Sequence, residues 1–77
     1  FGSRIHTLLF EPIDPISTVM LQDEIHATIT AYEPRVRIRH LTATPTNDEQ
    51  GYDIECFFHI VNQVAPVTLT LYLSRLR

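Results

Sequence analysis

The chain has 77 residues, enough for one small domain, and its apolar fraction of 44% is typical of a globular protein rather than a disordered one. Its net charge is −3 and all six basic residues are arginine, which argues against general nucleic-acid binding, because that function usually needs a basic excess. Cys56 is the only cysteine, so no internal disulfide can form, and no apolar run approaches the ~20 residues of a membrane span.

The N-terminal part of the chain predicts two helices. Residues Ser3 to Phe10 favour a short helix, in which Ser3 can cap the N-terminus and Ile5, Leu8 and Leu9 make a small apolar face. No signal peptide is visible. The chain also lacks an initiator methionine and opens at Phe1, so we expect its natural N-terminus to lie upstream.

A longer helix is expected from Ser17 or Thr18 to Tyr32, after a break that contains two prolines. Asp14 or Ser17 can cap its N-terminus. Its apolar spacing predicts an inward stripe of Leu21, Ile25, Thr28, Ile29 and Tyr32. The residues expected to face water are Gln22, Asp23, His26 and Thr30.

The four residues from Tyr32 to Arg35 mark the change from helix to strand. Pro34 has no amide hydrogen, and its ring disfavours helical dihedrals at Glu33, so the helix should end at Tyr32 without a glycine cap. The rigid ring then holds the charges of Glu33 and Arg35 at a fixed corner, which we predict to be a docking point. The alternative is that these two charges pair with each other, or with nearby strand residues, and only fasten the helix end.

Three antiparallel strands are predicted after this corner, over residues 35–44, 52–62 and 67–74. In the first strand the alternation slips between Ile38 and Leu41, which predicts a bulge near Arg39-His40. The turn-forming residues 45–51 then connect the first two strands as a hairpin. Together with the helices, this predicts an α+β fold, with two N-terminal helices packed on a three-stranded antiparallel sheet.

The second strand has two different faces. One face, expected to pack on the helix, carries Tyr52, Ile54, Cys56, Phe58 and Ile60. The other face begins with Asp53 and Glu55, which we expect to balance Arg35, Arg37 and Arg39 across the hairpin. Farther along, this face becomes apolar at Phe57 and Val61. An exposed face should stay polar along its length, so the far end of the sheet should be covered by the first helix or by another protein.

The third strand shows the cleanest alternation in the chain. One face carries Val67, Leu69, Leu71 and Leu73, and the other carries Thr68, Thr70, Tyr72 and Ser74. A flat edge strand without lysine or an internal proline can pair with a strand of another chain. The alternative is that it pairs only within its own sheet.

Other kinds of site find little support in the sequence. The four histidines are scattered, and none of them forms the i, i+4 pair typical of a helical metal site. Cys56 lies on an apolar strand face, where it should behave as a small buried hydrophobe. With two glycines in all, the chain has no glycine-rich phosphate loop. We therefore predict no metal site and no cofactor.

Three elements then occur in a specific order: Phe1-Gly2-Ser3, the segment Leu8-Leu9-Phe10-Glu11-Pro12, and a helix that leads into Tyr32-Glu33-Pro34-Arg35-Val36. In this order the chain resembles the baseplate wedge, or sheath-initiator, family of contractile phage tails. That family is often labelled gene-25-like lysozyme and has relatives in type VI secretion baseplates. The resemblance spans nearly the whole chain and implies a single wedge domain over residues 1–77, without the stretch that precedes the Phe-Gly element.

The resemblance implies a non-enzymatic structural subunit, located in a virion tail baseplate or in the bacterial cytoplasm at the inner membrane face. It implies that Glu33, Pro34 and Arg35 dock on the helical core bundle of other wedge proteins. It also implies that the stretch from Val67 to Leu73 adds its strand to the tail sheath protein and so initiates the sheath. Nucleic acid and membrane insertion are not implied.

Two further hypotheses remain open. The lysozyme label suggests a cell-wall glycan hydrolase, with Glu11 and Glu33 as acid and base. A glycosidase needs two carboxyl groups about 5–10 Å apart across a sugar cleft, and a small chain without tryptophan is a poor host for one. A small adaptor of the same fold, which binds a regulatory protein, is the other hypothesis.

Overall fold

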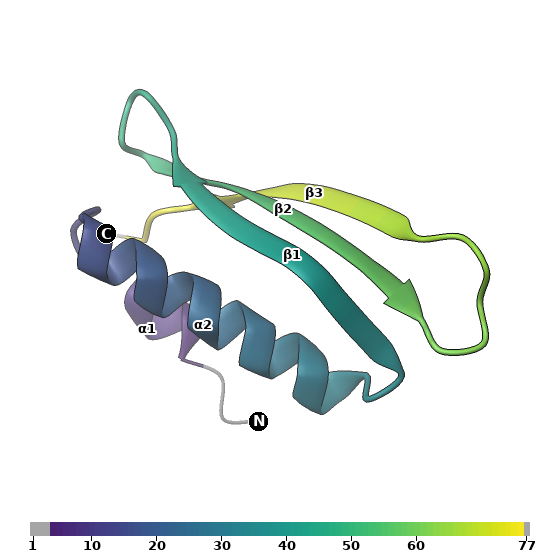
Figure 1. The fold of residues 1–77 in the computed structure, drawn as a ribbon. Helices are drawn as coiled ribbons and strands as arrows, with labels where there is room; N and C mark the ends of the chain where they lie inside the picture. Colours follow the sequence, from purple (N-terminus) through teal and green to yellow (C-terminus); the bar gives the residue numbers. More distant parts are fainter. Residues whose placement is uncertain (1–3, 77) are drawn as a thin grey trace.

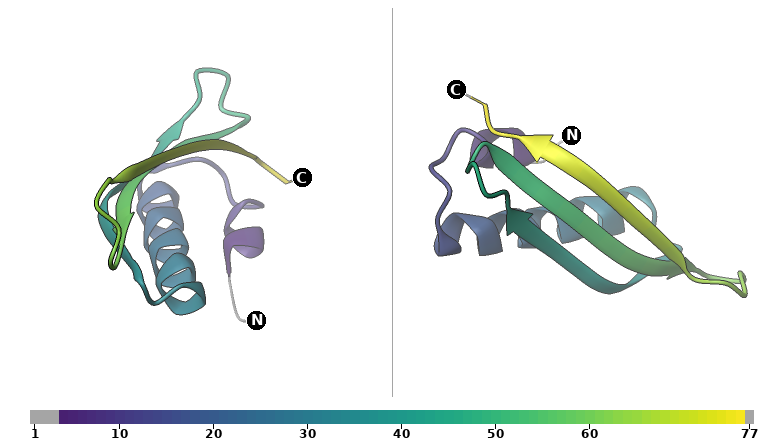
Figure 2. Two further views of the ribbon diagram at one scale, coloured as in Figure 1. Left: turned by 90° about the vertical axis from the view of Figure 1, so that its right-hand side faces the viewer. Right: turned by 90° about the horizontal axis from the view of Figure 1, so that it is seen from above.

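The computed structural model describes residues 4–76 as two helices followed by three strands (Figure 1). In chain order these are α1 (Ile5–Leu8), α2 (Pro15–Tyr32), β1 (Val36–Pro45), β2 (Gly51–Ile60) and β3 (Val67–Ser74). The strands form one antiparallel sheet in the order β1-β2-β3. Figure 2 shows the sheet arching over the helices, which both lie on one of its faces.

The predicted α+β class and the three-stranded antiparallel sheet are confirmed. The prediction of two helices packed on the sheet needs a correction, because α1 is a single turn of four residues and packs mainly against α2. The expected cap at Ser3 lies outside the described residues. A backbone hydrogen bond of 2.9 Å from the Leu76 amide to the Leu9 carbonyl ties the segment after α1 to the segment after β3.

Helix α2 ends where the sequence predicted and begins slightly earlier. The Asp14 carboxylate accepts a hydrogen bond of 2.7 Å from the Ser17 amide, and Pro15 occupies the first turn, where its missing N–H has no cost. Two predictions about which side chains of α2 face the core and which face water were wrong. Tyr32, in the last turn, is 74% exposed. Gln22, expected in water, is half-buried, and its Oε1 accepts a hydrogen bond of 2.9 Å from the Ala43 amide.

The predicted bulge in β1 is confirmed, because the register with β2 shifts between Ile38 and His40. The shift leaves Arg39 without a pairing partner in β2. It also places the apolar residues of both halves of β1 on the same face of the sheet. The inner face of the sheet then meets the helices in one apolar core. The buried residues of this core are Leu8, Leu9, Leu21, Ile25, Ala43, Tyr52 and Ile54.

The expected charge balance on the outer face of the sheet was wrong. Arg37 lies opposite His59, whereas Asp53 and Glu55 lie opposite Thr44 and Thr42. The reason is antiparallel geometry, since the first residues of β1 pair with the last residues of β2. The arginines and the carboxylates therefore occupy opposite ends of the outer face.

Helix α1 does not cover the outer face of the sheet. The expectation that the first helix covers the apolar end of β2 was therefore wrong. Phe57 is 38% exposed on this face, and both helices lie on the other. The hypothesis that another protein covers this end stays a prediction.

The hairpin between β1 and β2 is closed by local hydrogen bonds. The Thr46 hydroxyl donates to Asp48 Oδ1 at 2.6 Å, and the Gln50 amide donates to the same oxygen at 3.0 Å. Both hydrogen bonds lower the pKa of Asp48, and the bond from Thr46 has the larger effect. Gly51 follows, and no side chain would fit there, because a Cβ atom would collide with the Leu73 carbonyl and the Tyr72 ring.

We predict that Leu21→Ala lowers the free energy of unfolding by about 2–5 kcal/mol, because this side chain is 1% exposed and its loss leaves a cavity beside Tyr52 and Ile54. Urea unfolding followed by circular dichroism measures the change. The matched control is Val19→Ala on the same helix, where the side chain is 54% exposed and the change should stay within about 0.5 kcal/mol. Equal losses from both variants would contradict this account of the core.

Candidate functional site

The predicted corner is a β-turn that joins α2 to β1. The Val36 amide donates to the Glu33 carbonyl at 3.0 Å, which places Pro34 at the second position of the turn, where proline is favoured. The Arg35 carbonyl accepts a hydrogen bond of 2.8 Å from the Val61 amide, just beyond the end of β2. The backbone of the corner is therefore fixed to both the helix and the sheet.

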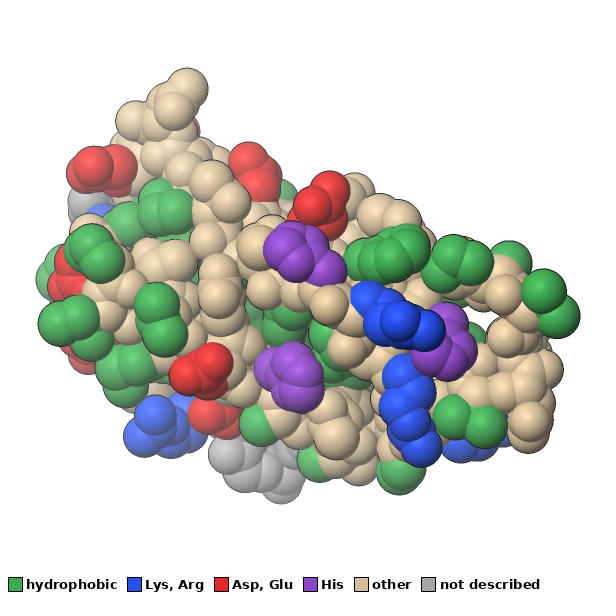
Figure 3. All heavy atoms as spheres, in the orientation of Figure 1, with side chains coloured by type: hydrophobic (Ala, Val, Ile, Leu, Met, Phe, Trp, Pro, Cys, Tyr) green, Lys and Arg blue, Asp and Glu red, His purple; other side chains and the backbone are tan. Residues whose placement is uncertain are grey.

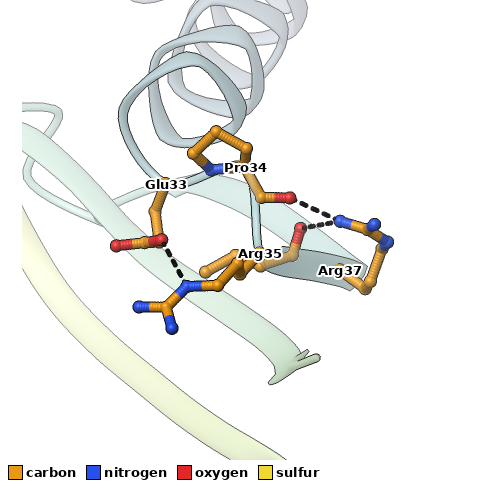
Figure 4. Close-up of polar contacts among 5 residues, drawn as sticks. Glu33, Pro34, Arg35 and Arg37 are labelled. Carbon is orange, nitrogen blue, oxygen red and sulfur yellow. Dashed lines mark hydrogen bonds and ion pairs between the residues drawn. The ribbon is translucent and has the colours of Figure 1, made fainter. Parts of the chain in front are cut away.

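The charged side chains of the corner remain open to solvent (Figure 4). Arg35 Nε lies 3.3 Å from Glu33 Oε1, and the two side chains are 71% and 47% exposed. Arg37 Nη1 donates to the Pro34 carbonyl at 2.6 Å and to the Val36 carbonyl at 3.3 Å. Figure 4 shows the two terminal nitrogens of Arg35 pointing away from Glu33. The corner thus presents a guanidinium beside a carboxylate on a rigid backbone.

Strand β3 is an edge strand whose inward-facing side chains are left partly uncovered. It pairs with β2 on one side, and Val67, Leu69 and Leu71 are 40%, 44% and 42% exposed. Their neighbours Ile54 and Cys56 in β2 are 3% and 2% exposed. Figure 2 shows the cause of the exposure of β3: α2 lies beneath β1, and the short α1 lies near the C-terminal end of β3.

An apolar hollow of about 250 Å³ opens between the helices and the inner face of β3. Its nine lining residues are all apolar: Ile5, Ile25, Ile29, Leu41, Ile54, Cys56, Leu69, Leu71 and Leu73. Burial raises the pKa of the Cys56 thiol, which keeps this group neutral beside the hydrocarbon side chains. The alternation of β3 predicted a half-buried strand but gave no sign of this hollow, because its walls come from five separate elements.

The structure does not bring the two predicted docking sites together. The corner precedes β1 at one edge of the sheet, and β3 forms the other edge, with β2 between them. Glu11 and Glu33 are also separate, because they lie beyond opposite ends of the 18-residue helix α2, which is about 27 Å long. A glycosidase needs carboxyl groups about 5–10 Å apart, so these two cannot act as one acid–base pair.

A metal-binding cluster and a membrane-spanning helix are both absent from residues 4–76. No group of three or more histidine, cysteine, aspartate or glutamate side chains is arranged to hold a metal ion. Neither helix in this part of the chain combines the length and the hydropathy needed to cross a bilayer.

Comparisons with known proteins match the chain to a protein family and to solved structures. The family model for baseplate wedge protein gp25 matches residues 1–64, which include both helices, β1 and β2 but not β3. The crystal structure of a proposed tail lysozyme from Geobacter sulfurreducens has the same fold, with a TM-score of 0.85 and 20% sequence identity. That alignment covers 100% of this chain and 70% of the other. A comparison with curated proteins gives no match.

We predict that Arg35→Ala changes the free energy of unfolding by less than about 1 kcal/mol, because its ion pair with Glu33 is exposed and solvent screens it. Urea unfolding of the variant beside the wild-type protein measures this. A loss comparable to that of Leu21→Ala would show that the pair fastens the helix end, which is the structural alternative to docking.

Proposed function

Because the chain belongs to the family of baseplate wedge protein gp25, we propose that it is a non-enzymatic structural subunit of a contractile-tail or type VI secretion baseplate. In this proposal the corner docks on the helical core bundle of other wedge proteins, and β3 initiates the sheath by adding its strand to the tail sheath protein. The observation that carries the proposal is the pair of half-exposed leucines, Leu69 and Leu71, on an edge strand beside an apolar hollow.

The register of the sheet supports strand addition to β3. Two rows of inner-face residues cross it, Leu41–Cys56–Leu69 and Ala43–Ile54–Leu71. A strand paired with the free edge of β3 would extend both rows by one residue, and apolar side chains at those positions would cover Leu69 and Leu71. Main-chain hydrogen bonds would then supply affinity and the hollow would supply specificity. The family match ends before β3, so this part of the proposal rests on the structure of the edge itself.

Docking at the corner follows from the chemistry of Arg35 and Glu33. A guanidinium held on a rigid turn can bind a carboxylate, or the carbonyl groups at a helix end, through two parallel hydrogen bonds. Glu33 can in turn accept hydrogen bonds from exposed donors of the same partner. Because the corner and β3 lie at opposite edges of the sheet, the domain can contact two partners at once without competition between them.

The first test is co-assembly with purified wedge proteins, measured by size-exclusion chromatography with light scattering. We expect Glu33→Ala combined with Arg35→Ala to reduce complex formation at least about tenfold, because both contacts are removed from a fixed turn. The control removes the ion pair between Arg4 and Glu24, in which Arg4 is 63% exposed and Glu24 is 20% exposed, and should assemble as the wild-type protein does. Normal assembly of a folded corner variant would reject the docking role.

The second test places an inward-pointing charge on the edge strand. We expect Leu71→Lys to abolish binding to the tail sheath protein, because an inward-pointing lysine on an edge strand opposes pairing with another strand. The control, Asn47→Lys, adds the same charge at an exposed position in the loop between β1 and β2 and should bind normally. Surface plasmon resonance measures both, and heteronuclear NMR spectra verify that each variant is folded. Undiminished binding by Leu71→Lys would reject strand addition.

A further inference from the structure

The segregation of charge on the outer face leaves a basic cluster at one end of the sheet. This cluster consists of Arg37, Arg39, His40 and His59. Figure 3 shows arginine side chains and a histidine side chain together toward the right-hand end of this face, with no Asp or Glu side chain beside them in that view. Charges of one sign that gather on a protein surface favour a partner of the opposite sign.

Within this cluster Arg39 differs from the other two arginines of the β1 region. Arg35 pairs with the Glu33 carboxylate, and Arg37 donates to two backbone carbonyls. Arg39 Nε donates to Nδ1 of His59 at 3.3 Å, and no carboxylate of residues 4–76 forms an ion pair with it. Its terminal nitrogens therefore keep their donor capacity, and the Nε2–H of His59 adds a donor, since its Nδ1 is the acceptor.

An open hollow of about 390 Å³ adjoins these donors. It is lined by Arg39, Phe57, His59, Gln63, Val64 and Pro66. The bulge at Arg39 places the guanidinium there, and Asn62, with a left-handed φ of 73°, shapes the turn that carries the apolar wall formed by Val64 and Pro66. Phe57 is 38% exposed and Val64 is 102% exposed. The hollow thus combines a cationic end with an apolar wall.

We propose that this hollow binds a protein segment in which an Asp or Glu side chain stands next to an apolar side chain. The carboxylate would be held by the free edge of the Arg39 guanidinium, and the apolar neighbour would cover Phe57 and Val64. None of the residues that line this hollow belongs to the corner or to β3, so its occupant goes beyond the two contacts proposed above. Nucleic acid is a poorer occupant, because the chain carries a net charge of −3 and this cluster has one guanidinium without a bound oxygen.

The proposal can be tested by titrating the full ¹⁵N-labelled chain with short peptides and following NMR chemical shifts. The probe is an N-acetylated, C-amidated hexapeptide, Ser-Ser-Glu-Leu-Ser-Ser. We expect its shifts to centre on Arg39, Phe57 and Val64, and we expect the Glu→Gln peptide to bind at least about tenfold more weakly. Replacing the leucine of the peptide by serine should also weaken binding.

Protein variants then separate a specific site from diffuse charge. Arg39→Gln should weaken binding at least about tenfold, whereas Arg37→Gln removes the same charge from the same strand and should change it less than about twofold. Unshifted amide resonances elsewhere in the spectrum establish that both variants are folded. Equal effects of the two variants would overturn the proposal, as would the absence of shifts with any peptide. Tighter binding of inorganic phosphate, of a DNA oligonucleotide, or of a free C-terminal carboxylate would also overturn it.

Discussion

The turn at Pro34 is the constraint on which the rest of the structure depends. It ends α2 at Tyr32, starts β1 at Val36, and is fixed by hydrogen bonds to the Glu33 and Arg35 carbonyls. Because the turn sets the direction of β1 relative to α2, it also decides which strand face meets the helix. The pairing register between β1 and β2 then determines which face of β2 is buried. A glycine in place of Pro34 would allow more backbone conformations, because it lacks the ring that fixes φ.

The exposure of β3 follows from the widths of its neighbours. A helix with its side chains is about 10–12 Å wide, and adjacent strands lie about 4.8 Å apart, so one helix covers about two strands. Helix α2 packs against β1, and the single turn of α1 is too short to cover the length of β3. An uncovered apolar strip at the edge of the sheet is therefore a consequence of having one long helix for three strands.

Local features of the fold could be predicted from the sequence, because each has a local cause. Pro34 predicted the end of α2, the shifted alternation predicted the bulge near Arg39-His40, and Asp14 was one of two candidate caps. Properties that depend on how separate elements meet could not be predicted. Tyr32 has the spacing of a core residue but lies at the end of the helix, where no strand covers it.

The two surfaces of greatest functional interest show the same limit. Sequence alternation placed Leu69 and Leu71 on one face of β3, but it could not show that the helices leave this face half-open. The separation of Arg39 from Asp53 and Glu55 depends on the register of the hairpin, which composition does not reveal. The corner was the easier prediction, because Glu33 and Arg35 are neighbours of the proline that positions them.

The hydrogen bond between the Leu76 amide and the Leu9 carbonyl has a consequence for the order of folding. Four residues are too few for a helix to persist by itself, so α1 depends on contacts that the remainder of the chain provides. One of those contacts comes from a residue beyond the last strand. Because this contact joins residues far apart in the chain, it can stabilise α1 only after the strands have paired, later than the local hydrogen bonds of α2.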